Sequence, residues 1–520
     1  MEPALPSQLF AKKSIDKLIA NSEEPEHRLK KTLGPWSLTA LGIGAIIGSG
    51  IFVLTGTAAA GEHFAVPSIF KAQVLDLFLN LIQHGTTSGV IMHGRPPAGP
   101  AIAISFILVA VACSFAGLCY AELASMIPIA GSAYTYSYAT LGEIFAWVIG
   151  WDLILEYAVS NVAVAIGFGG YFKSQLAQFH ILLPDKWSNP VWQGGQWTGA
   201  YFNFPAFLIV FVLTVLLVRG VRESAEANNV MVVIKIGAIL TFLVVGGMLA
   251  SPANLHPFAP AGFSGILAGG AIIFFTYIGF DSVSTAAEEA KMPQRDIPIG
   301  IIASLIVCTI LYVGVALVLL AMMKYTTFLS GDAAMAPVAY ALQHLGAKPA
   351  FQAVIIIGAL MGMISSLLVF QYGQTRIWFA MSRDGLLPRI FSAVHPKFKT
   401  PHWSSWIAGA AVGIPAGLVD IGDAADLSNI GTLFAFVLVS LGVIVLRRTQ
   451  PERPRGFRVP LVPLFPLISV VLCVSLMSGL LLITWVRFFV WLFIGLAIYF
   501  FYSRKHSEFA QGAARQNRRR

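Results

Sequence analysis

Long apolar stretches, separated by short polar segments, run through most of the chain. A helix that crosses a bilayer needs about 20 apolar residues, and roughly twelve stretches approach or exceed this length. The pattern therefore predicts an all-α integral membrane fold with about twelve membrane-spanning helices. The predicted spans cover residues 36–60, 100–124, 142–170, 203–219, 228–250, 263–290, 298–323, 351–380, 403–419, 428–446, 464–482 and 486–503.

The composition supports this class and argues against a soluble protein. Hydrophobic residues make up 57% of the 520 positions, charged residues make up 11%, and the mean hydropathy is +0.75. Soluble domains usually carry about 25% charged residues. The formal net charge is +9, but the basic residues lie between the apolar stretches and leave no soluble basic face for nucleic acid. We therefore expect the lipid bilayer as a partner and no nucleic acid.

Lysine and arginine are divided unevenly between alternate loops. They are frequent at residues 12–31, 219–222, 291–295, 383–399, 447–458 and 504–520, and sparse in the loops between these. The positive-inside rule places the basic set in the cytoplasm. We expect a multi-pass protein of the cell (inner) membrane with both termini cytoplasmic. Its N-terminal segment is 1–33 and its basic tail is 504–520.

Two of the predicted spans contain glycine-rich segments that interrupt a regular helix, at residues 42–52 and 274–281. Irregular backbone at membrane depth persists only where it lines a cavity with polar partners. Paired interruptions in two halves of a chain are typical of the binding site of a secondary transporter. If spans one to five and six to ten are repeats, the second copy is inverted, because five is odd. We further expect both interrupted spans to begin at the cytoplasmic side.

The exposed backbone dipoles at these interruptions favour a zwitterion. Helix N-termini beyond the first interruption favour a carboxylate, and carbonyl groups released at the second favour an ammonium group. Close packing of small residues is an alternative that accounts for Gly44 and Gly48 but less well for Ser49 and Gly50. The pattern argues against a dinucleotide loop, because an apolar helix and not a strand is predicted before it. No metal pair or nucleophile–base set has suitable spacing, so we expect no enzyme, no metal and no cofactor.

Several motifs resemble the bacterial type of the cationic amino acid transporter-like branch of the amino acid–polyamine–organocation superfamily. They lie at residues 42–52, 119–124, 130–136, 150–157, 279–289 and 293–298. The resemblance implies a leucine-transporter-type 5+5 inverted repeat with broken helices 1 and 6. That core would occupy 34–446, followed by two additional transmembrane helices at 447–503. It also implies uptake of an α-amino acid by alternating access.

The same resemblance implies roles for individual residues. Ile46, Ser49, Gly50 and Ile51 would hold the carboxylate side of the substrate. Phe275, Thr276 and Ile278 would receive the amine and cover the substrate, and Phe280 and Asp281 would line or support the pocket.

One external segment departs from the family pattern. Residues 62–97 form an insertion for which the pattern predicts an amphipathic helix at 68–83. An inert decoration, an external gate and a partner contact are the alternatives for this insertion.

Ionisable residues inside apolar spans are the candidates for proton coupling. Lys235 lies deep in the fifth span, where a charge is costly and usually functional. The alternative is a lysine that snorkels to the cytoplasmic face. In transporters that this chain resembles, a lysine here replaces a bound sodium ion. Glu156, Glu122 and Asp281 either relay protons or support the bundle statically.

The expected function is secondary active transport of an amino acid, coupled to protons as symport. An amino acid exchanger, a polyamine permease and a substrate sensor on the same fold remain alternatives. The sequence does not select the substrate side chain, and it leaves the oligomeric state unknown.

Overall fold

The computed structural model of the protein is mainly helical, and the residues that it describes form two short two-stranded sheets. It describes residues 8–16, 33–63, 68–85, 94–127, 129, 132–193, 196–219, 225–287, 290–329, 331–398 and 400–508. The greater part of the expected N-terminal segment 1–33, parts of the insertion 62–97 and residues 509–520 of the basic tail lie outside these ranges.

Eight helical segments of the described chain are long and apolar enough to cross a membrane, and a ninth is a bent pair. Seven of the eight run as α5 (Ile102–Met126), α7 (Glu143–Gln178), α9 (Ala225–Leu249), α12 (Pro293–Met322), α15 (Pro349–Arg383), α17 (Ile421–Thr449) and α19 with its continuation (Leu482–His506). The eighth is Gly262–Ser284, which includes α10 (Gly262–Ile273), η7 (Phe274–Tyr277) and the first residues of α11 (Ser282–Thr285). The bent pair is α2 (Pro35–Ile46) with Gly50–Ala60, which covers η2 (Gly50–Leu54) and α3 (Thr55–Ala60).

The three remaining predicted spans coincide with shorter helices. These are α8 (Phe204–Arg219), α16 (His402–Leu418) and α18 (Leu464–Ser478). The number of twelve spans therefore stays a prediction. The other described elements are η1 (Gln8–Phe10), β1 (Glu62–His63), η3 (Ile69–Lys71), α4 (Val74–His84), β2 (Gly94–Arg95), η4 (Gly99–Ala101), α6 (Ser132–Thr140), η5 (Asp185–Trp187), β3 (Trp192–Gln193), β4 (Gln196–Trp197), η6 (Pro252–Leu255), η9 (Tyr325–Leu329), α13 (Gly331–Met335), α14 (Pro337–His344), η10 (Arg389–Ser392), η11 (Tyr499–Ser503) and α20 (Arg504–His506).

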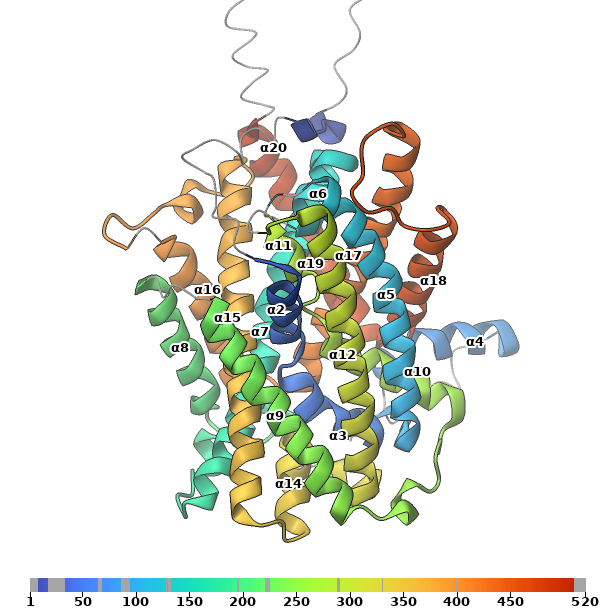
Figure 1. Ribbon diagram of the computed structural model, residues 1–520, viewed down its shortest axis with the longest axis vertical. Coiled ribbons are helices and arrows are strands. Elements are labelled where there is room, and N and C mark those ends of the chain that lie inside the picture. The colour runs from blue at the N-terminus through green and yellow to red at the C-terminus, as the bar shows by residue number, and fades with distance from the viewer. Residues whose placement is uncertain are drawn as a thin grey trace, which may run out of the picture.

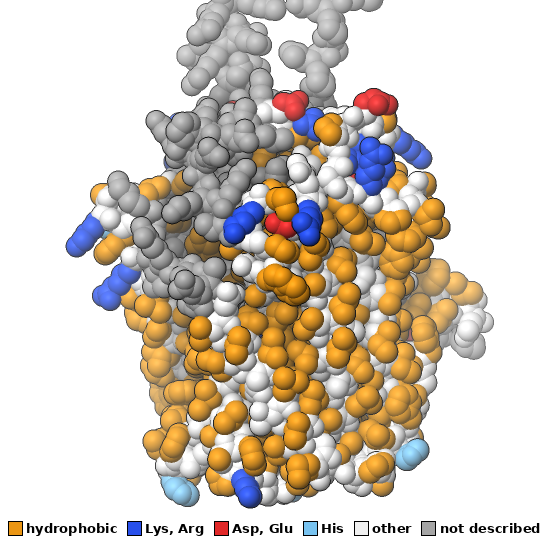
Figure 2. Space-filling view, in the orientation of Figure 1, with side chains coloured by type: hydrophobic (Ala, Val, Ile, Leu, Met, Phe, Trp, Pro, Cys, Tyr) orange, Lys and Arg blue, Asp and Glu red, His pale blue; other side chains and the backbone are white. Residues whose placement is uncertain are grey.

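The two ends of the described chain meet at one face of the bundle (Figure 1). Lys13 forms ion pairs with Asp384 at 2.6 Å and with Glu508 at 3.2 Å. A common face requires an even number of crossings, and twelve spans meet this condition. Figure 2 shows a broad belt of apolar side chains, with most charged side chains of this view gathered at that same end. The belt is the surface expected of a bundle that faces lipid.

The two interrupted helices run in opposite directions. Leu33, which precedes α2, forms a parallel bridge with Ala290, and its carbonyl accepts a hydrogen bond from the Lys291 N–H at 2.8 Å. The start of the first interrupted helix therefore lies beside the end of the second. The expectation that both begin at the same side is wrong, because five crossings separate the two helices in the predicted order. The opposite directions agree with an inverted repeat.

The interrupted helix α2 is surrounded by longer helices. It packs against α12, α9 and α15, and α7 packs extensively against α15 and α17. The apolar stretch of α7 is 83% buried, whereas that of α19 is only 22% buried. The interruptions are therefore enclosed by protein and removed from lipid, as irregular backbone at this depth requires.

The described part of the insertion is anchored to the core by a buried ion pair. Strand β1 pairs with β2, and Arg95 of β2 donates two hydrogen bonds to the Asp426 carboxylate on α17, one of them at 3.0 Å. Glu62 lies 3.4 Å from the same guanidinium. At the other end, the Val74 N–H donates to the Leu480 carbonyl at 3.2 Å. The insertion is thus joined to α17 and to the turn between α18 and α19.

Because of Glu62, the stability of this anchor depends on pH. Burial, opposed by Arg95 and reinforced by Asp426, Asp420 and Asp423, raises the pKa of Glu62 from 4.5 to about 7. Between pH 4.5 and about 7, Glu62 therefore keeps its proton in the folded protein, whereas the unfolded chain has already released it. The free energy of unfolding therefore falls as the pH rises through this window. The Glu62 side chain stays 25% exposed, which moderates the effect.

We expect Glu62→Gln to remove this pH-dependent loss of stability. Thermal unfolding of purified protein in detergent, measured from pH 5 to pH 8, should show the variant gaining relative to the unmodified protein as the pH rises. Glu452→Gln, at an exposed position outside the anchor, is the control and should follow the unmodified protein. Parallel curves for Glu62→Gln and the unmodified protein would contradict the assignment.

Candidate functional site

The first interruption begins where α2 ends. Ile47 is extended, with φ −78° and ψ 91°, and the chain resumes as a π-helical turn at Gly50. The two helical halves are bent by 44°. Glycine suits this segment because neighbouring side chains approach closely. A Cβ on Gly48, for example, would lie 2.7 Å from the hydroxyl of Ser366.

The second interruption follows α10. The helix tightens into the 3-10 turn η7, Ile278 is extended with ψ 135°, and Gly279 has φ +117°. That backbone conformation favours glycine over any residue with a Cβ. Both interruptions that the glycine patterns predict are therefore present.

The two interruptions touch each other. A Cβ on Gly50 would lie 2.9 Å from the Cα of Thr276, and one on Gly279 would lie 3.0 Å from the backbone of Ala45. The Tyr312 hydroxyl on α12 lies 2.9 Å from the Ile46 carbonyl and 3.0 Å from the Thr276 carbonyl. This hydroxyl therefore supports both interruptions.

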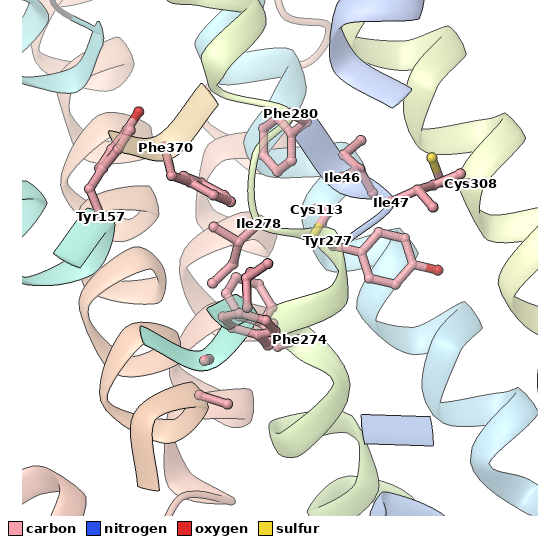
Figure 3. Packing of buried hydrophobic residues seen from close by; sticks show 14 of the residues in the cluster. Ile46, Ile47, Cys113, Tyr157, Phe274, Tyr277, Ile278, Phe280, Cys308 and Phe370 are labelled. Carbon is pink, nitrogen blue, oxygen red and sulfur yellow. The ribbon is translucent and has the colours of Figure 1, made fainter. Parts of the chain in front are cut away.

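Apolar side chains gather around this contact (Figure 3). The extended backbone between Tyr277 and Phe280 runs beside the end of α2, which carries Ile46. Ile278 and Phe280 converge with Phe370 of α15. Of the other predicted site residues, Ile51 is fully buried and Phe275 is 5% exposed. The structure thus brings all eight predicted substrate-binding residues to the two interruptions.

Two buried hydroxyl groups lack partners at this contact. Neither the Ser49 Oγ nor the Thr276 Oγ1 makes a hydrogen bond within the described chain. Leaving a buried polar group unpaired costs about 1–3 kcal/mol. One hydroxyl belongs to each interruption, so a polar ligand that reaches both would gain two hydrogen bonds.

Lys235 is buried against the first interruption. Its Nζ donates to the Gly44 carbonyl at 2.6 Å and to the Ile47 carbonyl at 3.0 Å. The snorkelling alternative is wrong, because the residue is fully buried and directed inward. These carbonyls belong to the stretch where the helix ends, and the ammonium donates to acceptors there that lose their helical partners.

Acidic side chains lie on α7 and at the second interruption. The Tyr157 hydroxyl donates to Asp281 at 3.4 Å and so connects α7 to the residue after Phe280. Asp152 and Glu156 are fully or almost fully buried. Both carboxylate oxygens of Asp152, Oε2 of Glu156 and Oδ1 of Asp281 make no hydrogen bond within the described residues. These three carboxyl groups are able to bind and release protons.

Glu122 lies in a different environment. Arg447 binds its carboxylate through Nε at 2.7 Å and Nη2 at 2.8 Å. The Arg455 Nε lies at 3.1 Å and the Val459 N–H donates at 2.7 Å. Such a network holds the ends of α5 and α17 together, which favours the static alternative. It also gives two arginines of the 447–458 block an ion-pairing role beside membrane orientation.

Tyr312 and Ser366 are site residues that the sequence analysis missed. Ser366 Oγ lies 3.4 Å from the carbonyls of Ala45 and Ile47. Both residues are polar positions in otherwise apolar spans, and this is the signal that points to them. The sequence alone does not tell which helix such a residue faces.

Comparisons with known proteins show the family of the chain. Residues 33–507 match the family model described as amino acid permease. The chain is 46% identical over 504 residues to the branched-chain amino acid permease BcaP of Bacillus subtilis (strain 168), covering 97% of this chain and 99% of the relative. It is 44% identical over 501 residues to the methylthioribose transporter of the same organism, covering 96% and 99%. The vacuolar cationic amino acid transporter 4 of Arabidopsis thaliana is 34% identical over 458 residues, covering 86% and 68%.

The apolar helices and these matches define a multi-pass membrane protein. The chain belongs to the amino acid permease family within the amino acid–polyamine–organocation superfamily.

The close contact between the two interruptions leads to a prediction about the stability of the protein. Gly50→Ala places a methyl group against the Thr276 backbone, and such overpacking costs about 1–3 kcal/mol. Gly247→Ala in α9 is the control, since a Cβ there meets no atom within 4 Å. We expect thermal unfolding in detergent to show a lower midpoint for the first variant and an unchanged or higher one for the second. Equal midpoints would show that the two interruptions do not pack as described.

Proposed function

We propose that the protein carries an α-amino acid across the membrane by alternating access. The observation that carries this proposal is the contact between two interrupted helices, each with one buried hydroxyl (Ser49 or Thr276) that has no hydrogen-bond partner among the described residues. The amino acid permease family match agrees with it. The protein acts as a carrier and not as an enzyme in this proposal.

The two ends of the substrate bind to opposite interruptions. The helix that resumes at Gly50 directs its first N–H groups and the positive end of its dipole toward the break, where Ser49 adds a hydroxyl. A carboxylate suits this end. The carbonyl groups freed at the end of η7 and the Thr276 hydroxyl within it suit an ammonium group.

The side chain of the substrate faces an apolar surface. Ile278, Phe280 and Phe370 converge beside the interruptions and offer contact to a small apolar group (Figure 3). One relative is named for branched-chain amino acids, whose side chains have this chemistry. Another, at similar identity, is named for methylthioribose, which carries no carboxylate or ammonium group. We favour a small neutral amino acid such as leucine, because the two interruptions offer complementary poles.

The finer architecture is part of the proposal. It comprises twelve spans, a 5+5 inverted repeat in the core 34–446 and two additional helices at 447–503. Both termini are cytoplasmic and the membrane is the cell membrane. The parity of the crossings and the opposite directions of the interrupted helices support this arrangement.

Proton coupling rests on Lys235. An ammonium group on the Gly44 and Ile47 carbonyls holds the first interruption in place, and its deprotonation removes the positive charge from that contact. Asp281 and Glu156 extend the set of groups able to exchange protons. A proton therefore replaces a metal cation in this proposal, and symport is favoured over exchange.

We expect Lys235→Met to abolish accumulation driven by a pH gradient. Radiolabelled leucine in proteoliposomes should reach only its external concentration with the variant and exceed it with the unmodified protein. Lys324→Met, at an exposed lysine outside the site, is the control and should accumulate normally. Normal accumulation by Lys235→Met would contradict the assignment. Dependence on sodium without dependence on the pH gradient would contradict proton coupling.

Thr276→Val tests the amine end of the site. The change removes the hydroxyl at nearly constant shape, and a hydrogen bond to a charged group contributes about 1.5–3 kcal/mol. Calorimetry should show a dissociation constant for leucine at least about tenfold higher. Thr140→Val is a matched control, because that buried hydroxyl already donates to the Tyr136 carbonyl. If methylthioribose binds the unmodified protein and leucine does not, the amino acid assignment is wrong.

A further inference from the structure

Helices α9 and α15 cross closely at two small residues. A Cβ on Gly358 of α15 would collide with Ala238 of α9, so only glycine permits this approach. One turn away, a Cβ added to Gly362 would lie 3.5 Å from the Cδ atom of Lys235. Beyond the crossing, the two helices diverge toward the end of the bundle that carries α14 (Figure 1).

The divergence leaves a groove of about 620 Å³ on the outside of the bundle. Its α9 wall includes Leu240, Val244 and Met248, and its other wall includes Phe351 of α15. Small-molecule sites typically have volumes of about 300–1,000 Å³, and the volume of this groove falls within that range. The groove is therefore large enough for a ligand.

The walls of the groove suit hydrocarbon and not a polar metabolite. Val244 is 64% exposed and Met248 is 82% exposed, and both belong to a helix whose apolar stretch is only 33% buried. The hydroxyl of Thr241, which also lines the groove, already donates to the Gly237 carbonyl at 2.8 Å. The groove is thus continuous with the apolar surface that faces lipid, and an acyl chain is the occupant that its walls favour.

The end of the groove is positively charged. Lys348 lines it, is exposed, and precedes α15, a helix of 35 residues. Lys348 forms no ion pair with any residue that the structure describes. The positive end of the α15 dipole adds to the lysine charge at this point. An anionic headgroup complements this end, as an acyl chain complements the walls.

We propose that this groove is a binding site for an anionic phospholipid. One acyl chain lies between α9 and the start of α15, and the phosphate group binds Lys348. The site is independent of the proposed transport function. The bound chain would fill the space beside the crossing and so hold α9 against α15, one turn from Lys235.

Native mass spectrometry tests this proposal on the full-length protein. The protein is mixed in detergent with equal amounts of phosphatidylglycerol and phosphatidylethanolamine, and the retained lipid is identified. We expect one phosphatidylglycerol to be retained in preference. Lys348→Ala should weaken its retention about fivefold, since a basic residue contributes about 1 kcal/mol to anionic lipid binding. Lys324→Ala, an exposed lysine outside the groove, is the charge control and should change nothing.

A second pair of variants tests the groove itself. Val244→Trp fills the groove, whereas Val471→Trp adds the same group to α18 at a position of nearly equal exposure, 63%. We expect only the first to remove the retained phospholipid, while both unfold at similar temperatures in lipid-free detergent. Equal retention of the two lipids, equal losses in Lys348→Ala and Lys324→Ala, or equal retention in the two tryptophan variants would each overturn the proposal.

Discussion

The constraint on which the structure depends is the need to satisfy backbone polar groups away from water. Each unsatisfied group in hydrocarbon costs several kcal/mol, so a helix breaks at membrane depth only where other groups replace its hydrogen bonds. Here Lys235 and Tyr312 supply donors to the carbonyls around the first interruption, and Tyr312 reaches the second as well. The bundle of α7, α9, α12 and α15 then keeps lipid away from both.

The same constraint connects the fold to its chemistry. Once the interruptions are held by surrounding helices, the groups that remain unpartnered are those available to a ligand. Ser49 and Thr276 are such groups, and they lie on different interruptions that contact each other. Tyr157 links Asp281 to α7, so the acidic side chains connect to the same region. A carrier that changes its opening needs a site of this kind, shared between elements that are able to move relative to each other.

The helical fold and the two interruptions followed from the sequence. Glycine-rich interruptions are readable because glycine occurs where backbone approaches backbone, as at Gly50 and Gly279. The inward direction of Lys235 was predictable, because a charge deep in an apolar span needs partners. The short α8 and α18 show that apolar stretches of similar appearance differ in helical length. The predicted direction of the second interrupted helix was wrong, because an odd number of crossings, five in the predicted order, separates the starts of the two helices.

Contacts between distant segments were the part that the sequence did not reveal. Arg95 meets Asp426 across 331 positions, and Glu122 meets Arg447 across 325. Tyr312 resembles any tyrosine in an apolar span until the packing of α12 against α2 is known. Such contacts depend on which helix faces which, and periodicity within one helix leaves this open.

The most direct measurement of the central claim compares leucine with two analogues that each lack one pole. Leucinamide lacks the carboxylate, and 4-methylpentanoate lacks the ammonium group. A ligand stabilises the folded state to which it binds, so thermal unfolding of the purified protein reports recognition. If the two interruptions hold opposite ends of one zwitterion, leucine raises the unfolding temperature and neither analogue does so at the same concentration. Stabilisation by either analogue equal to that by leucine would contradict the account.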